Sequence, residues 1–558
     1  MSEQASQSPA DTKQKPKQTS QSTTLVRLAE KAGIELFHDA DLNGYAVIRT
    51  GGHRETLPLR SKEFRLWLQR LFWADRKGAA NSQAVQEALG VLRGKALFDS
   101  PERPVAVRLA ALDGAIWLDL ANERWQAVRI DSDGWRVIDD PPVRFTRRRG
   151  MLPLPMPKRG GSLDELRTLV NVGSDDDWLL LLAWTIAAFR PDRPFPLLAL
   201  NGEQGCAKST TCRILRGLID PNHSALRSAP KEPRDLMIAA SNSWVVAFDN
   251  LSSVPAWLSD ALCRLSTGGG FATRELYSDG DEILFDAMRP IILNGINSLS
   301  TRSDLLDRTV ALTLPAISDG GRRTEEEINS ELDRARPRIL GALLDAVSTA
   351  LCNVGTVRLP GKPRMADFAV WSVAAEPAMG CEPGAFLAAY TRNREALNES
   401  AIESSIIAEP LLTFLADKDE WKGTATDLLE SLRLITGDRT ISQKEWPKRP
   451  HTLSGKLRRI APNLRRIGIE TEFLRDGNSA RKRLIRFTRT NSVRSVRSVQ
   501  YGSDERPPER PQHSGASTGA STRNPGNNGE MASSDAPDAL DAQIPNNSGE
   551  LLTGVDRF

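Results

Sequence analysis

The residues with the clearest potential for chemistry form a glycine-containing segment that ends in a lysine and a serine. The segment reads Gly202-Glu203-Gln204-Gly205-Cys206-Ala207-Lys208-Ser209, and Thr210 follows it. The apolar run Leu197–Leu200 before it is typical of a buried strand, and residues 209–218 after it are typical of a helix. A turn placed between a strand and a helix directs backbone N–H groups toward phosphate oxygens. The segment therefore predicts a nucleotide phosphate loop.

The last residues of this segment predict ATP and Mg²⁺ as cofactors. Lys208 would reach the β- and γ-phosphates, and the Ser209 hydroxyl would be a ligand of Mg²⁺. One residue departs from the usual pattern, because Ala207 stands where a last glycine is expected. Its Cβ is compatible with the loop if Ala207 adopts helical dihedral angles. The alternative is an ordinary turn before a helix.

A second apolar run ends in an acid and an amide, Asp249 and Asn250. If residues 245–248 form a parallel strand, Asp249 lies at its carboxyl end, where ligands bind such sheets. There Asp249 would hold Mg²⁺ through water. An acid usually follows in ATP-hydrolysing proteins, whereas an asparagine can orient water but cannot accept its proton. Binding of ATP is therefore more firmly indicated than its hydrolysis.

Two further polar residues follow in an order that suits the same site. Asn294 ends the run Ile291–Leu293 and could orient the attacking water. Arg308 lies about one helix further on and could stabilise transition-state charge across a subunit interface. Taken alone, an arginine of this kind is usually a solvated or ion-paired residue.

The elements that must position these residues predict an α/β fold. Residues 197–200, 245–248, 291–293 and 310–314 are buried apolar runs separated by helical stretches. Such a pattern favours a parallel sheet with helices on both faces. Residues 178–189 follow three aspartates and predict a buried helix that is too short to span a bilayer.

Together these motifs resemble those of the superfamily-three helicases, which are AAA+ ATPases. The resemblance rests on residues 202–210, 246–250 and 267–277, and on Asn294 and Arg308. It is strongest to the helicase half of the primase-helicases of phages, plasmids and poxviruses, and it covers about residues 160–340. It implies an ATP-driven DNA motor of a mobile genetic element, assembled as a homo-hexamer, with Arg308 acting in trans.

The same resemblance implies a DNA contact inside the ring. The segment Thr267–Tyr277 is similar to a family motif that leads into a hairpin in the central channel, so Arg274 is a candidate contact to single-stranded DNA. The alternative is a surface loop with one exposed arginine. The sequence shows no primase signature, so a separate primase or polymerase is an expected partner.

The C-terminal part of the chain is locally basic. Residues 441–490 contain 14 Lys or Arg and 4 Asp or Glu. An expected helix at 425–434, a second at 452–467 and a hairpin through Asp476-Gly477-Asn478 resemble a winged helix-turn-helix, which would bind duplex DNA. The candidate DNA contacts are Lys456, Arg458, Arg459, Arg481 and Arg483. A solvated basic face or a protein-docking domain is the alternative.

The predicted organisation follows from these assignments. The net charge of +3 over 558 residues places any nucleic-acid surface locally rather than globally. The expected parts, in chain order, are a disordered tail (1–23), an α+β domain (24–150), a linker (151–164), the P-loop AAA+ ATPase (165–335), a helical segment (336–400), the winged helix (401–490) and a second disordered tail (491–558).

Several classes of protein are disfavoured by the sequence. Five cysteines without a CxxC pair argue against a zinc ribbon or a disulfide framework and fit a reducing cytoplasm. No membrane partner is expected. Two alternatives to the motor remain open: an ATP-gated DNA-binding initiator or regulator that does not unwind, which Asn250 favours, and a signalling or defence ATPase.

Overall fold

The computed structural model describes residues 19–274, 282–285, 287–295, 303–475 and 483–489. The predicted tail at 491–558 lies outside these residues, as do most of the N-terminal tail and the turn at 476–478. The predicted extent of the first tail is wrong by a few residues, because helix α1 begins at Gln21, where the Ser20 side chain accepts a hydrogen bond from Thr23 N. No helix in the described ranges has the length and apolar character of a membrane span.

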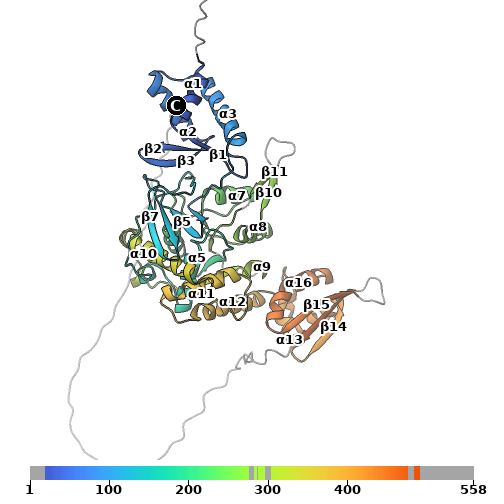
Figure 1. Ribbon diagram of the computed structural model, residues 1–558. Helices are drawn as coiled ribbons and strands as arrows, with labels where there is room; N and C mark the ends of the chain where they lie inside the picture. Colours follow the sequence, from blue (N-terminus) through green and yellow to red (C-terminus); the bar gives the residue numbers. More distant parts are fainter. Residues whose placement is uncertain (1–18, 275–281, 286, 296–302, 476–482, 490–558) are drawn as a thin grey trace, which may run out of the picture. The chain divides into compact units, whose positions relative to one another are not determined.

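The predicted N-terminal domain contains two sheets with separate cores. The first group comprises three helices around an antiparallel sheet, and its core includes Leu25, Phe64 and Leu92 (Figure 1). Its elements are α1 (Gln21–Lys31), β1 (Glu35–His38), β2 (Gly44–Thr50), β3 (His53–Pro58), α2 (Lys62–Arg76) and α3 (Ser82–Phe98).

The second sheet is a four-stranded antiparallel meander that shares its core with the following region. Ile116, Leu118 and Ile130 belong to one buried cluster with helices that lie beyond residue 160. The strands are β4 (Leu109–Leu112), β5 (Ala115–Asp119), β6 (Ala127–Asp131) and β7 (Gly134–Ile138). The residues between this meander and the next region pack tightly on helix α10, because a Cβ on Gly161 would lie 2.2 Å from the Arg338 carbonyl oxygen.

A parallel four-stranded sheet forms the centre of the chain, in the order β13-β8-β12-β9. The predicted parallel sheet, with helices on both faces, is confirmed. Its strands are β8 (Leu197–Asn201), β9 (Val246–Phe248), β12 (Ile291–Asn294) and β13 (Thr309–Thr313). Side chains alternate between two cores: Leu198 and Leu200 enter one, whereas Leu197 and Ala199 enter the other.

Different helices cover the two faces of this sheet. One core contains residues of α5 (Asp175–Ala187), α6 (Lys208–Ile219), α10 (Glu325–Asn353) and α11 (Ala366–Met379). The other contains residues of α7 (Pro233–Asn242) and α8 (Ala256–Thr267). The remaining elements here are α4 (Asp164–Arg167), hairpin strands β10 (Phe271–Arg274) and β11 (Glu282–Phe285), α9 (Ser303–Leu306), η1 (Asp319–Gly321) and α12 (Ala385–Glu403).

The C-terminal group has its own core around Leu428, Leu457 and Phe487. A three-stranded sheet in the order β14-β16-β15 packs with four helices, one of which, α16, is close to the predicted basic helix (Figure 1). The elements are α13 (Ala408–Leu415), β14 (Glu420–Thr424), α14 (Ala425–Ile435), α15 (Asp438–Ile441), α16 (Pro450–Arg466), β15 (Ile469–Arg475) and β16 (Arg483–Arg489).

Candidate functional site

The glycine-containing segment forms a loop at the carboxyl end of the central strand β8. Helix α6 begins at Lys208, as a phosphate loop requires. Gly202 has a φ of +134°, and a Cβ there would lie 2.6 Å from the Leu314 carbonyl oxygen. The backbone that directly follows strand β13 therefore passes too close for any larger residue at the start of the loop.

Ala207 corrects one expectation from the sequence. It does not adopt right-handed helical angles, because its φ is 64° and its ψ is 27°. This left-handed conformation costs a residue with a Cβ about 1–2 kcal/mol. The missing glycine therefore leaves a local strain in the loop, immediately before the residue that starts helix α6.

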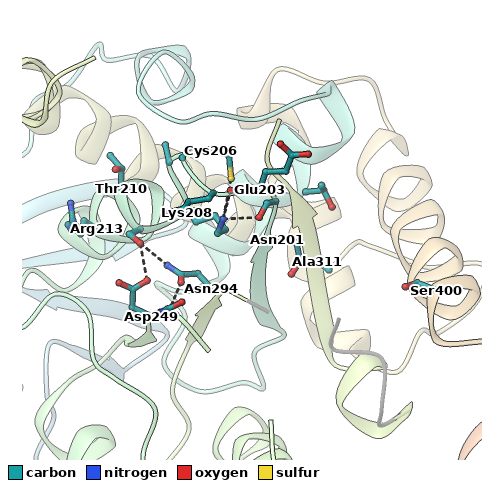
Figure 2. A pocket seen from close by; sticks show the side chains of 18 of the residues that line it. Asn201, Glu203, Cys206, Lys208, Thr210, Arg213, Asp249, Asn294, Ala311 and Ser400 are labelled. Atoms are coloured by element: carbon teal, nitrogen blue, oxygen red, sulfur yellow. Dashed lines mark hydrogen bonds between the residues drawn. The ribbon is translucent and has the colours of Figure 1, made fainter. Parts of the chain in front are cut away.

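The ammonium group of Lys208 folds back onto its own loop (Figure 2). Its Nζ donates to the carbonyl oxygens of Gly202 at 2.8 Å and Glu203 at 2.7 Å, and lies 3.4 Å from Cys206 Sγ. An ammonium group can donate three hydrogen bonds. In this arrangement the charge lies inside the curve of the loop, where an anion would meet it.

Four polar residues from three elements meet beside Lys208 (Figure 2). Ser209 Oγ donates to Asp249 Oδ1 at 2.9 Å, and Asn294 Nδ2 lies 3.3 Å from the same hydroxyl. Asn294 Oδ1 accepts from Asn250 N at 2.8 Å. The predicted residues are thus brought together, although the Asn294 carboxamide is buried and holds its neighbours in place.

This cluster fits a hydrated Mg²⁺ ion. A hydroxyl oxygen and a carboxylate oxygen 2.9 Å apart, at the start of helix α6, are the hard donors that Mg²⁺ prefers. Such an ion keeps several waters and takes further oxygens from phosphates, so two protein oxygens are sufficient. The neighbouring thiol does not compete, because burial raises the pKa of Cys212 to about 12 and keeps it protonated.

A pocket of about 1330 Å³ opens over the loop and the cluster. All the predicted loop residues, Gly202 to Thr210, line it, together with Asp249, Asn250 and Asn294. Its further wall is formed by Ala311 and Thr313 of β13 and by Ala396, Leu397 and Ser400 of helix α12. The volume exceeds that of most small-molecule sites, which occupy roughly 300–1,000 Å³.

Two asparagines that the sequence did not single out position this pocket. Asn171 Nδ2 donates to the carbonyl oxygens of Cys206 at 3.1 Å and Pro315 at 2.7 Å. Asn393 donates to the Ala311 carbonyl oxygen at 2.6 Å and accepts from Ala311 N at 3.3 Å. Neither residue lies in a recognisable motif, and no signal in the sequence links them to the loop.

Arg308 lies at the other end of the sheet from the loop. It directly precedes β13, whose first residue pairs with Leu197, whereas the loop follows Asn201. Four strand steps separate these ends, roughly 13 Å at about 3.3 Å per residue. Arg308 forms an ion pair with Asp304, and its side chain is 13% exposed. Burial opposes ionisation of Asp304, but the hydrogen bond and charge of Arg308 outweigh it and lower its pKa.

The candidate DNA contacts fall into separate places. Arg274 is the last residue of β10, paired with Glu282, and its side chain lies outside the described residues, as does all of Arg481. Arg458 and Arg483 line one groove of about 440 Å³ between α16 and the β15–β16 hairpin. The Arg458 guanidinium lies 4.7 Å from the centre of the Phe473 ring.

The other two candidates on α16 do not line this groove. Lys456 is half-buried and Arg459 is exposed. Both come from the same helix as Arg458, whose buried face is formed by Leu453, Leu457, Ile460 and Leu464.

Comparison with known proteins places this architecture in a family. Residues 163–400 match the family described as actinomycete integrative conjugative element replication protein, and residues 407–504 match the AICE RepA C-terminal domain. Two solved apo structures of the NrS-1 C terminal region align with 84% of this chain and with 99% and 100% of their own, at 12% and 11% identity and a TM-score of 0.36. A comparison with curated proteins gives no match.

The fold and the site therefore define a mixed α/β protein with a polar pocket at the end of a parallel sheet. Two models of one family match adjacent parts that together exceed half of this chain. The chain belongs to the replication proteins of integrative conjugative elements. The expected roles in DNA replication and in a mobile genetic element are thereby confirmed.

Proposed function

We propose that the chain is a Mg²⁺-dependent ATPase of the AAA+ class that drives DNA unwinding during replication of its element. The observation that carries this proposal is the cluster of Lys208, Ser209, Asp249 and Asn294 at the mouth of one pocket. A loop between a strand and a helix, a lysine, and a hydroxyl beside a carboxylate are the groups that a nucleoside triphosphate with its metal requires.

Each residue of the cluster has a separate task in this proposal. Lys208 exchanges its two carbonyl partners for phosphate oxygens, which are stronger acceptors because they are charged. Ser209 and Asp249 would hold Mg²⁺, which would neutralise charge on the phosphates. Asn294 keeps Asn250 and Ser209 in register, and Asn250 lines the pocket in which water would attack.

The position of Arg308 supports assembly into a ring. Arg308 cannot reach the pocket of its own chain, because it lies at the opposite end of the sheet. That end of the sheet could meet the pocket of a neighbouring chain. A homo-hexamer with Arg308 supplied in trans is therefore part of the proposal. Arg308 must break its ion pair with Asp304 in order to act. The loss of this ion pair would then be coupled to the contact between subunits.

DNA contacts complete the proposed motor. The β10–β11 hairpin that carries Arg274 would contact single-stranded DNA in the channel. The C-terminal group would act as a winged helix in which Arg458 and Arg483, on either side of one groove, bind duplex DNA. Lys456, Arg459 and Arg481 would add phosphate contacts, which give salt-dependent affinity.

The test is ATP turnover with and without single-stranded DNA, in the presence of Mg²⁺. The wild-type chain should hydrolyse ATP faster with DNA, and Lys208→Ala should abolish both rates. Lys362→Ala, which removes an exposed lysine outside the pocket, is the matched control and should match wild type. Wild-type turnover equal to that of Lys208→Ala would overturn the ATPase proposal.

A second candidate, an ATP-gated initiator that does not unwind, is favoured by Asn250. This residue occupies the place of the expected base and has a left-handed backbone with a φ of 54°. An amide cannot accept the proton of the attacking water. A strand-displacement assay separates the candidates, because an initiator would bind DNA in an ATP-dependent way without displacing a strand.

A further inference from the structure

Helix α2 in the N-terminal group has two faces of different character. Phe64, Leu68 and Phe72 are buried in the group's core. On the opposite side, Leu66 is 53% exposed and Trp73 is 57% exposed. These two residues are seven positions apart, so they lie on the same side of the helix, about 10 Å apart along its axis. An exposed tryptophan and leucine on one line are more typical of a contact surface than of a solvated helix face.

Basic side chains surround this apolar line. Lys62, Arg65 and Arg70 on the helix and Lys77 directly after it are all exposed. Within the described parts of the chain, none of these four forms an ion pair. Arg76 contacts its neighbour Asp75. The only other acid on the helix is Glu63. Four exposed cations and one exposed acid, Glu63, therefore lie along the Leu66–Trp73 line and leave it with a net charge of +3 (4 − 1).

We propose that this outward face of α2, defined by Lys62, Arg65, Leu66, Arg70, Trp73 and Lys77, binds single-stranded DNA. Proteins that hold single strands combine cations that follow the phosphates with aromatic rings on which bases stack. The face offers both groups, and the chain is a replication protein. A protein partner would need several acids to match the rim, whereas every nucleotide brings a phosphate and a base.

The single strand is favoured over duplex DNA by Trp73. In a duplex the faces of the bases are already stacked on one another, so an indole on a helix surface would meet only their edges or the backbone. An unpaired base offers its face. This surface would add a contact outside both the hairpin of Arg274 and the C-terminal groove, and it does not depend on ATP.

The test uses the full chain without nucleotide, with two linked measurements. Fluorescence anisotropy would follow binding of an oligothymidine of about 30 nucleotides, which is longer than the roughly 4–16 nucleotides of one single-strand site. Photocrosslinking of the same oligonucleotide carrying 5-iododeoxyuridine, followed by mass spectrometry, would locate the contact.

Three results are expected. Trp73→Ala weakens binding about tenfold, whereas Trp73→Phe retains most of the affinity because its ring can still stack. Arg65→Ala with Arg70→Ala lowers the slope of log affinity against log salt by about 1.4, or about 0.7 for each phosphate contact. The crosslink falls on the peptide that contains Trp73 and is lost in Trp73→Ala.

Matched controls come from the same group of elements. Phe98→Ala removes another highly exposed aromatic ring, and Arg27→Ala with Lys31→Ala removes two exposed cations from helix α1. Both should leave affinity, salt slope and crosslink unchanged. All the substituted side chains are exposed, so the unfolding midpoint should move little.

Two results would overturn the proposal. One is unchanged affinity and salt slope in the α2 variants, with crosslinks only elsewhere in the chain. The other is loss of binding in the arginine variant alone, with Trp73→Ala unchanged and duplex preferred over single strand. The second result would show a phosphate surface for duplex DNA, without base stacking.

Discussion

The side chains of Arg108 and Asp220 form a buried ion pair between the antiparallel meander and the end of helix α6. Arg108 Nε donates to Asp220 Oδ1 at 3.0 Å, and the two side chains are 0% and 1% exposed. The other carboxylate oxygen accepts from the backbone nitrogens of Trp244 at 2.8 Å and Val245 at 3.2 Å. One carboxylate thus joins the meander, the helix that follows the loop, and the approach to strand β9.

Removing this carboxylate should strongly destabilise the fold. In Asp220→Ala, the guanidinium of Arg108 and two backbone N–H groups lose a buried acceptor, which costs about 3–5 kcal/mol for a broken buried pair. Urea unfolding should show the loss as a lower midpoint. The control is Asp176→Ala, which breaks the exposed Arg392–Asp176 pair and should cost less than about 1 kcal/mol. Equal losses in both variants would contradict the assignment.

Ala207→Gly should stabilise the protein, although glycine usually weakens the interior of a helix. It removes a left-handed conformation that costs about 1–2 kcal/mol, offset by about 0.4–1 kcal/mol of extra freedom in the unfolded chain. A net gain of about 0.5–1 kcal/mol should be seen in urea unfolding. The control Ala388→Gly, in helix α12, should instead lose about 1 kcal/mol. The same sign for both substitutions would argue against strain at Ala207.

Asn250→Asp should raise the rate of ATP hydrolysis, if the chain is an ATPase as proposed. A carboxylate at this position can accept the proton of the attacking water, and a general base contributes about 100-fold or more to a rate. We expect kcat to rise at least about tenfold, with KM little changed. Asn250→Ala is the control for loss of the amide alone. A fall in kcat for Asn250→Asp would indicate that the amide itself is the group required.

Mixing two inactive variants should restore ATP turnover. Lys208→Ala lacks the phosphate contact and Arg308→Ala lacks the proposed trans residue, so each should be inactive alone. A mixed ring contains some interfaces at which an intact pocket meets an intact Arg308. Arg364→Ala is the control, because Arg364 lies 3.5 Å from the same Asp304 carboxylate but is 51% exposed. No recovery on mixing would exclude action across an interface.

Thiol labelling should distinguish the cysteines by burial and pKa. Burial raises the pKa of both Cys212 and Cys263 to about 12, so at pH 8 their thiols stay protonated and unreactive. Cys352 is exposed and should react first. Because the folded-state pKa of both thiols is raised above the ordinary value of about 9, each protonated thiol contributes to the free energy of unfolding. This contribution is complete below about pH 9 and is lost as the pH rises from 9 toward 12. Rapid labelling of Cys212 in the folded chain would contradict this burial.

The sequence predicts the centre of the fold well because buried parallel strands are continuous apolar runs. The run before Gly202 and the run before Asp249 both form strands of one sheet, and the polar residues at their ends meet. Apolar runs do not reveal which strands share a core, however. The sequence predicts residues 24–150 as a separate domain, yet Ile116 and Leu118 of the meander pack in the same cluster as the central sheet.

Single backbone conformations and long-range polar contacts were not predictable. Strand β4 begins at Leu109, directly after Arg108, which has a φ of 64° and whose side chain turns toward Asp220. The handedness of Ala207 follows from how the loop enters helix α6, which sequence spacing does not show. Asn171 and Asn393 are isolated polar residues whose partners lie far away in the chain.

The contact of Asn393 with Ala311 determines how this sheet can meet another chain. Among the described residues, strand β13 lies at the edge of the sheet and pairs with β8 on one side only. The carboxamide takes both backbone groups of Ala311, as a further strand would do. Strand addition at this residue is therefore blocked, which guards the edge against aggregation. In the proposed ring, a neighbouring copy would therefore meet this residue through side chains, and such a contact would not extend the sheet.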